Sequence, residues 1–278
     1  MREREGEFAG AGGARLFYRM AAPVESAKGV VIAVHGLGDH SGGLRNLLTA
    51  LVENGYLAYA LDLRGHGKSP GKRGFIRTWE EFQGDLHSFR ERVVSETPSL
   101  PLFLAGHSLG GVICADYALS RGQGMSGLVL ISPAISYEAT FFEKCLIALL
   151  GAWKPDFAVQ KKGNQEWLTQ DSEIRARLAS DPLRHDTATS GLGLGLMKAV
   201  GRLGKEVVSL RIPLLLQFGL EDRITPPAKL RDFYRSVGSA DKRVFEYAGM
   251  RHRPFDDLRR ELFAWDLLEW LDGHAIAR

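Results

Sequence analysis

The pattern Gly-x-Ser-x-Gly, which can place a serine hydroxyl on a sharp turn, occurs twice in the sequence. Ser108 lies in the second copy, directly after the apolar run 102–105 and directly before a helical pattern. That context fits a strand-to-helix turn that exposes the hydroxyl for nucleophilic attack. Ser69 lies in the first copy, but Pro70 follows it and has no backbone N–H to offer a developing oxyanion. We therefore assign Ser108 as the candidate nucleophile and Ser69 as a turn residue.

A base must accompany such a serine, because the hydroxyl is a weak nucleophile at neutral pH. The base is in turn oriented by a carboxylate, and around this kind of turn the chain order is Ser, then Asp or Glu, then His. Among the 8 histidines, only His252 and His274 follow a late strand pattern. His274 stands close to the C-terminus, where chains are often poorly ordered. His252 precedes the last helical pattern in a loop, so we predict that it is the base.

The acid should lie in the loop after the preceding predicted strand, 214–218. Glu221 and Asp222 both stand in that loop. Position alone favours Asp222 only modestly, so both carboxylates remain open at this point.

The oxyanion of an acyl-transfer intermediate needs two backbone N–H donors. The residue after the nucleophile, Leu109, supplies one of them. The loop after the predicted strand 30–34 reads His-Gly-Leu-Gly, and the N–H of Leu37 is the candidate for the other. Taken alone, that loop is explained equally well as a plain glycine-rich turn.

Strand patterns alternate with helical patterns along most of the chain. Continuous β-branched runs such as 30–34 are typical of strands buried on both faces. The alternation predicts an α/β fold with a mostly parallel central sheet and helices on both faces. We expect strands at 6–10, 17–20, 30–34, 56–61, 102–105, 128–132, 214–218 and 243–247, and helices at 44–54, 79–95, 109–119 and 255–270.

One stretch, 134–210, shows no convincing strand and is too long to be a simple loop. We interpret it as a helical cap inserted into a single core domain made of 1–133 and 211–278. Its apolar cluster at 141–153 could line an acyl tunnel, contact a membrane surface, or pack within the cap.

Composition narrows the function further. A formal charge of +3 without long basic runs argues against nucleic-acid binding. Two cysteines are too few for a disulfide framework, and no histidine or cysteine spacing suggests a metal site. The N-terminus lacks a secretory signal, and no apolar run is long enough for a membrane span. We therefore expect a cytoplasmic protein without cofactor, metal or obligatory protein partner. Transient membrane contact through the cap is one of the alternatives left open for its apolar cluster.

Several motifs occur together in one order: HGLGDHSGG near the start, GHSLGG at the nucleophile, DPL at 181–183, GLEDRITPP, and MRH ending at His252. On these motifs the chain resembles the monoacylglycerol lipase and lysophospholipase-like α/β-hydrolases, over about residues 13–272. The resemblance implies an α/β-hydrolase fold with a helical cap over the acyl site. It also implies hydrolysis of monoacylglycerols, lysophospholipids or simple carboxylic esters without a cofactor.

Carried over residue by residue, the resemblance implies a triad of Ser108, Asp222 and His252, with the backbone N–H groups of Leu37 and Leu109 as the oxyanion hole. It thereby raises Asp222 above its neighbour. The leading hypothesis is cleavage of monoacylglycerols or similar lipid esters through an acyl-enzyme. The alternatives are a lysophospholipase or general carboxylesterase, a serine peptidase of the same fold, and a non-catalytic relative.

The chain departs from the family pattern beside the predicted base. Arg251 and Arg253 flank His252, where an uncharged residue often stands. Guanidinium groups pointing inward would disfavour the imidazolium. We expect them instead to face water or to pair with Asp256 and Asp257.

Overall fold

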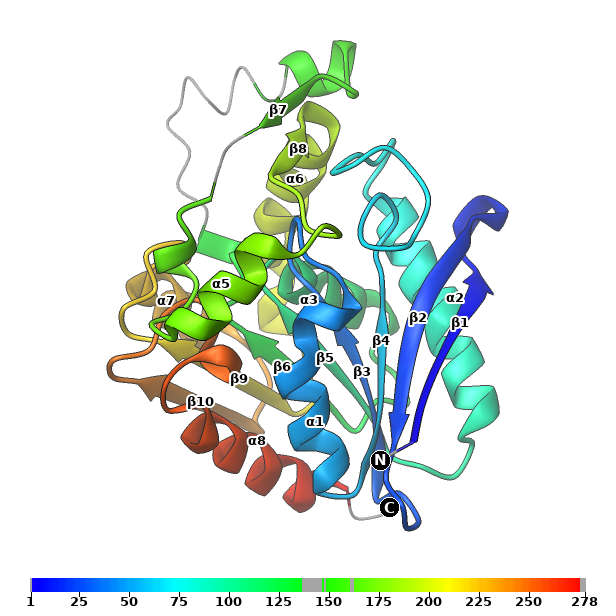
Figure 1. Cartoon of the computed structure of the whole chain (residues 1–278), viewed down its shortest axis with the longest axis vertical. Helices are drawn as coiled ribbons and strands as arrows, with labels where there is room; N and C mark the ends of the chain where they lie inside the picture. The colour runs from blue at the N-terminus through cyan, green and yellow to red at the C-terminus, as the bar shows by residue number, and fades with distance from the viewer. Residues whose placement is uncertain (1, 137–146, 148, 161–162, 276–278) are drawn as a thin grey trace.

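The computed structural model describes residues 2–136, 147, 149–160 and 163–275 of the chain. Its main element is an eight-stranded sheet with the strand order β1-β2-β4-β3-β5-β6-β9-β10 (Figure 1). Neighbouring strands from β4 to β10 are parallel, whereas β1 and β2 form an antiparallel edge. The strands are β1 (Arg2–Ala9), β2 (Arg15–Ala22), β3 (Gly29–Val34), β4 (Tyr56–Leu61), β5 (Leu102–His107), β6 (Gly127–Ile131), β9 (Leu214–Gly219) and β10 (Lys242–Tyr247).

Helices cover both faces of this sheet, as the sequence predicts. Val30 and Ile32 of β3 pack in one apolar cluster with side chains of α2 and α3. Val31 and Ala33 point the other way and pack with α1 and α8. Because successive residues of a strand face opposite sides, burial on both faces requires the continuous apolar run seen in β3. The helices of the core are α1 (Arg45–Glu53), α2 (Glu80–Glu96), α3 (Leu109–Arg121), α7 (Pro227–Ser236) and α8 (Arg260–His274).

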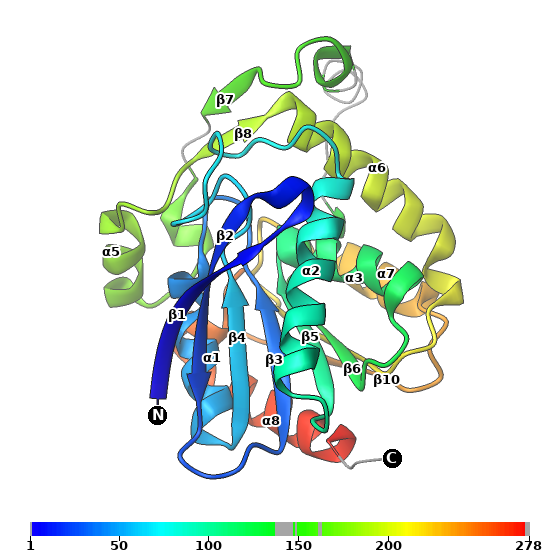
Figure 2. The ribbon, with the colours of Figure 1, turned by 90° about the vertical axis from the view of Figure 1, so that its right-hand side faces the viewer.

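The segment between β6 and β9 lies over the end of the sheet toward which β3 and β4 point (Figure 2). Its two longest described helices are α5 (Ser172–Ser180) and α6 (Ser190–Glu206). Leu192, Ala199 and Leu203 of α6 are buried against the core cluster that contains α3. The segment therefore rests on the core through its own apolar stripe, and we refer to it as the cap.

The expectation that the cap holds no strand is wrong. β7 (Ala158–Gln160) pairs antiparallel with β8 (Thr187–Thr189). Each strand is only three residues long, which is shorter than the runs in which polar–apolar alternation can be recognised. The partners are also far apart in sequence, so only tertiary contacts bring them together.

Part of the apolar cluster predicted at 141–153 lies outside the described residues, namely Phe141, Phe142 and Leu146. Within the ranges that the structure does describe, no helix is both long enough and apolar enough to cross a lipid bilayer. The last helix begins at Arg260, later than the sequence predicts, because Phe255 lies in a short 3₁₀ turn (Pro254–Asp256) that precedes it.

Candidate active site

Ser108 occupies the turn between β5 and α3. Its backbone has φ 53° and ψ −118°, a left-handed conformation that residues other than glycine rarely adopt. The turn is tight because strand, helix and neighbouring strand approach closely. A Cβ at Gly110 would lie 2.2 Å from the carbonyl oxygen of Val34, and one at Gly106 would lie 2.4 Å from the carbonyl oxygen of Gly110. The two glycines of the motif are therefore required by packing, and they hold a partly exposed serine on a buried turn.

Ser69, in the other copy of the motif, is a buried structural residue. Its hydroxyl donates to the carbonyl oxygen of Asp62 at 2.7 Å and accepts from the backbone N–H of Phe17 at 2.9 Å. These bonds tie the loop after β4 to β2. With both hydrogen-bonding roles of the hydroxyl used, Ser69 is the turn residue that the sequence predicts.

Asp222 and His252 contact each other, although 30 positions separate them in the chain. Nδ1 of His252 lies 2.8 Å from Oδ2 of Asp222, and both side chains are buried. Burial alone would raise the pKa of Asp222, but His252 and hydrogen bonds from Thr225 lower it below its usual range. The carboxylate is therefore ionised and accepts a hydrogen bond from the Nδ1–H of His252. Glu221 is exposed and contacts Gln170 at 3.2 Å instead.

Thr225 belongs to this arrangement and was missed in the sequence. Its hydroxyl donates to Oδ2 of Asp222 at 2.5 Å and lies 3.4 Å from Nδ1 of His252. The N–H groups of Ile224 and Thr225 donate to Oδ1 of Asp222 at 2.8 and 2.9 Å. An aspartate that accepts from residues two and three positions later is a recurrent turn. The spacing Asp-x-x-Thr was the available signal.

His107 connects the loop that carries His252 to the turn that carries Ser108. It directly precedes Ser108, and its Nε2–H donates to the carbonyl oxygen of His252 at 3.1 Å. The two imidazole rings lie 4.8 Å apart between centroids. Burial lowers the pKa of His107 well below its usual range, so the ring is neutral and the donor role is fixed. The other late histidine, His274, lies at the end of α8 and contacts Asp241.

The loop after β3 lies against the same turn. A Cβ at Gly36 would be 3.0 Å from Cβ of Ser108, so only glycine allows this approach without displacement. Within the described residues, the backbone N–H of Leu37 has no hydrogen-bond acceptor. Leu109 begins α3, and N–H groups in the first turn of a helix have no partner within the helix. Both backbone segments named from the sequence therefore border Ser108 with donors available.

The arginines beside His252 have different surroundings. The backbone N–H of Arg251 donates to Asp257 at 2.7 Å, while its guanidinium contacts the carbonyl oxygens of Glu166 and Thr169. Arg253 is buried and does not face water, but its Nε donates to Asp256 at 2.8 Å, which is one of the pairings expected from the sequence.

An eight-stranded, mostly parallel sheet with a strained serine on the turn after β5 defines an α/β-hydrolase. A family model described as serine aminopeptidase S33 matches residues 25–259. The chain belongs to this family of α/β-hydrolases.

Similar proteins include several monoacylglycerol lipases, which confirms the resemblance found in the sequence. The monoacylglycerol lipase of Mycolicibacterium smegmatis is 31% identical over 274 residues, covering 97% of each chain. The monoglyceride lipase of Rattus norvegicus is 32% identical over 246 residues, covering 87% of this chain and 81% of the relative.

Two solved structures agree with this relationship. The crystal structure of the Paleococcus ferrophilus monoacylglycerol lipase superposes with a TM-score of 0.82 at 32% identity, covering 99% of this chain and 100% of the other. A soluble variant of the Saccharomyces cerevisiae monoglyceride lipase, in complex with a substrate analog, superposes with a TM-score of 0.88 at 27% identity. That match covers 96% of this chain and 94% of the other.

Proposed function

We propose that this protein is a serine ester hydrolase that cleaves monoacylglycerols or similar lipid carboxylic esters through an acyl-enzyme on Ser108. The observation that carries the proposal is the buried contact between Asp222 and His252, which His107 ties to the serine turn. The similarity to monoacylglycerol lipases supports the substrate class.

In the proposed reaction, the hydroxyl oxygen of Ser108 attacks the ester carbonyl while Nε2 of His252 accepts its proton. Asp222 holds the imidazole in the tautomer that carries hydrogen on Nδ1 and stabilises the imidazolium that forms. The N–H groups of Leu37 and Leu109 bind the oxyanion, and each such donor is typically worth about 10²–10³ in rate. His252 then protonates the leaving alcohol. His252 next takes a proton from a water molecule, whose oxygen attacks the acyl carbonyl carbon. The bond from that carbon to the oxygen of Ser108 then breaks, His252 returns the proton to Ser108, and the fatty acid leaves.

Hydrolysis of a monoacylglycerol series from short to long acyl chains tests the proposal, alongside lysophosphatidylcholine and p-nitrophenyl esters. Replacing Ser108 with Ala should lower kcat by about 10⁴–10⁶ while leaving thermal unfolding near that of the wild type. The Ser69→Ala protein is the matched control, and its kcat per folded molecule should stay near the wild-type value. Substantial turnover by folded Ser108→Ala protein would refute the assignment of the nucleophile.

The same series separates the substrate classes. Preferential turnover of monoacylglycerol supports the lipase function. Preference for lysophosphatidylcholine makes the protein a lysophospholipase, and turnover confined to short p-nitrophenyl esters makes it a general carboxylesterase. Because the family model is described as a serine aminopeptidase, an aminoacyl amide and an ester of the same acyl group should also be compared.

We propose further that the cap contacts the lipid surface from which such substrates come. Four of the large apolar side chains that the described part of the cap exposes lie close together in sequence, and we call them the cap patch: Leu149, Trp153, Phe157 and Val159. Trp153 has 82% of its surface exposed, which is unusual for an indole in a water-soluble domain. β7, which carries Val159, lies at the end of the molecule opposite α8 (Figure 1).

Cosedimentation with phosphatidylcholine vesicles tests this contact. Trp153→Ser should weaken vesicle binding because the indole can no longer insert at the interface. Trp265 on α8 is 71% exposed, so Trp265→Ser is a matched control that should bind vesicles like the wild type. Equal vesicle binding by both variants and the wild type would contradict a role of the cap patch.

A further inference from the structure

Arg253, the residue directly after His252, is fully buried together with its charge. Only 1% of its surface is exposed. Its Nε donates to Oδ2 of Asp256 at 2.8 Å, one terminal nitrogen donates to Asp39, and the other donates to the carbonyl oxygen of Gly43 at 2.6 Å. Buried charge is costly unless it is paired and hydrogen-bonded, and here each arm of the guanidinium has an acceptor. The planar group therefore holds the segment 39–43 and the turn that contains Asp256 in a fixed geometry.

Asp39 places one end of this network on the loop proposed to bind the oxyanion. It stands two positions after Leu37, and its backbone N–H donates to the carbonyl oxygen of Gly36 at 3.2 Å, which closes the loop. Burial alone would raise the pKa of Asp39, but the guanidinium groups of Arg253 and Arg184 hold it well below its usual range. Asp39 is therefore a buried carboxylate anion between two cations.

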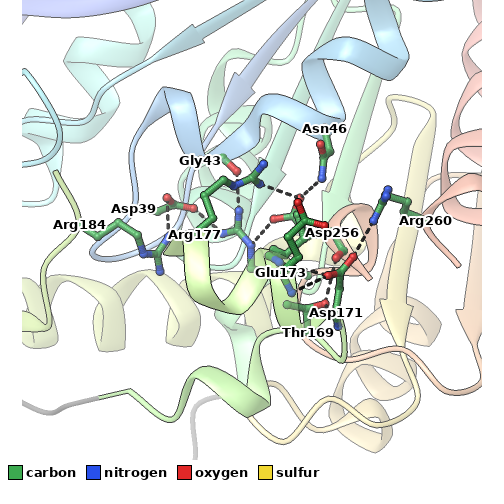
Figure 3. Close-up of polar contacts among 12 residues, drawn as sticks. Asp39, Gly43, Asn46, Thr169, Asp171, Glu173, Arg177, Arg184, Asp256 and Arg260 are labelled. Atoms are coloured by element: carbon green, nitrogen blue, oxygen red, sulfur yellow. Dashed lines mark hydrogen bonds and ion pairs between the residues drawn. The ribbon is translucent and has the colours of Figure 1, made fainter. Parts of the chain in front are cut away.

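The cap contributes the second of those cations. Arg184, in the stretch between α5 and β8, donates to Oδ1 of Asp39 at 2.7 Å (Figure 3). The backbone N–H of the next residue, His185, donates to the carbonyl oxygen of Gly38 at 3.1 Å. The cap thus contacts two consecutive residues of the loop that carries Leu37. Asp256, at the other end of the network, also accepts from Asn46 of α1 at 2.7 Å.

We propose that Arg253 and Asp39 are positioning residues for the hydrolytic reaction. Their ion pair joins the residue after the proposed base, His252, to the loop of the proposed oxyanion donor, Leu37. It thereby sets the position of the base relative to the donor, and Arg184 of the cap completes the pair. This inference rests on the proposed function. Its physical basis is that a misplacement of about 1 Å among reacting groups can cost about a hundredfold in rate.

Arg253→Met tests the inference, because methionine fills much of the volume and removes all three hydrogen bonds. With p-nitrophenyl butyrate as substrate, kcat should fall by about thirty- to a hundredfold, whereas KM should change less than about threefold. The rate at which a fluorophosphonate probe labels Ser108 should fall by the same factor, since that reaction needs the base and the oxyanion donors but no acyl pocket.

Arg202→Met is the matched control. Arg202 of α6 pairs with buried Asp116 of α3, so it also joins cap to core by an arginine–aspartate pair, but it touches neither the His252 loop nor the Leu37 loop. Its kcat should stay within about twofold of the wild type at a temperature where both variants are folded. If Arg253→Met and Arg202→Met reduce kcat by the same factor at the same loss of thermal stability, the Arg253–Asp39 pair has only a structural role and the inference is wrong.

Asp39→Asn keeps the inference testable if Arg253→Met does not fold. Asparagine has the shape of aspartate and can still accept from Arg253, but the ionic attraction is lost. We expect kcat to fall by about tenfold with KM unchanged, and wild-type kcat in this variant overturns the inference. Failure of the proposed function itself looks different, because the fluorophosphonate would then fail to label the wild-type protein at Ser108.

Discussion

Asp222 and Glu221 are adjacent carboxylates with opposite surroundings. Asp222 is buried and accepts hydrogen bonds from three directions, namely from His252, from Thr225 and from the backbone of its own turn. Glu221 is exposed and lies beside Gln170. The chemistry of the side chain is nearly the same in both, so environment alone separates an orienting carboxylate from a surface one.

At this scale we predict that Asp222→Asn lowers kcat by about 10³–10⁴ without unfolding the protein, because an amide favours the wrong imidazole tautomer. Glu221→Gln is the matched control and should keep kcat near the wild-type value. Steady-state hydrolysis of p-nitrophenyl butyrate measures both. A large loss of kcat in Glu221→Gln, with Asp222→Asn still active, would exchange the roles of the two residues.

The elements around Ser108 meet at distances that leave no room for side chains. β3, β5 and α3 converge at Gly110, where an added Cβ would lie 2.2 Å from the carbonyl oxygen of Val34 and 2.6 Å from that of His35. The helix can begin directly after Ser108 only because of this close packing. The position of the Leu109 N–H is therefore a property of how the three elements pack together.

Gly110→Ala should accordingly destabilise the protein by about 1–3 kcal/mol and lower kcat, since the new methyl group pushes α3 away from β3. Gly201→Ala is the opposite case, because a Cβ at this exposed position of α6 meets nothing within 4 Å. There alanine should stabilise by about 0.5–1 kcal/mol, as expected for a glycine inside a helix. Thermal and urea unfolding measure both changes. Equal stability of the two variants would show that the turn tolerates a methyl group.

Across the whole molecule, several histidines are buried without charge. Burial lowers the pKa of His66 well below its usual range, and the neighbouring His35 and His185 lower it further. Burial likewise lowers the pKa of His185 to about 4. The rings of His66 and His185 lie 4.7 Å apart and join the Gly65–Gly67 turn of the core to the cap. Below about pH 6.5 the unfolded chain protonates these histidines while the folded chain does not.

Because the unfolded state then binds more protons, the free energy of unfolding should fall as pH drops from 7 to 5. His66→Gln removes one of the responsible groups. We predict that its stability falls less steeply over this interval, by up to about 1.4 kcal/mol per pH unit. Above pH 7 the two proteins should differ by a constant amount. Urea unfolding across the pH range provides the measurement, and identical slopes below pH 6.5 would contradict the prediction.

Much of the architecture was predictable from the sequence. The central strands are buried on both faces, and such strands have continuous apolar sequences that can be recognised. The predicted strand 56–61 has the same first and last residues as β4. The context of Ser108 and the late position of His252 also follow from the order of these elements. Patterns that repeat along the chain report on local structure, because each residue's burial depends on the element to which it belongs.

Tertiary structure decided the features that depend on residues distant in sequence. It paired β7 with β8, turned Asp222 rather than Glu221 toward His252, and added Thr225 to that pair. It also buried Arg253, which the sequence suggests should face water or pair with nearby acids. Arg253 does pair with nearby Asp256, but its other carboxylate is Asp39, from a loop 214 positions away. The charge of an arginine can be buried only when the fold brings acceptors to its guanidinium group. Because Asp39 is distant in sequence, no local sequence pattern predicts this pairing.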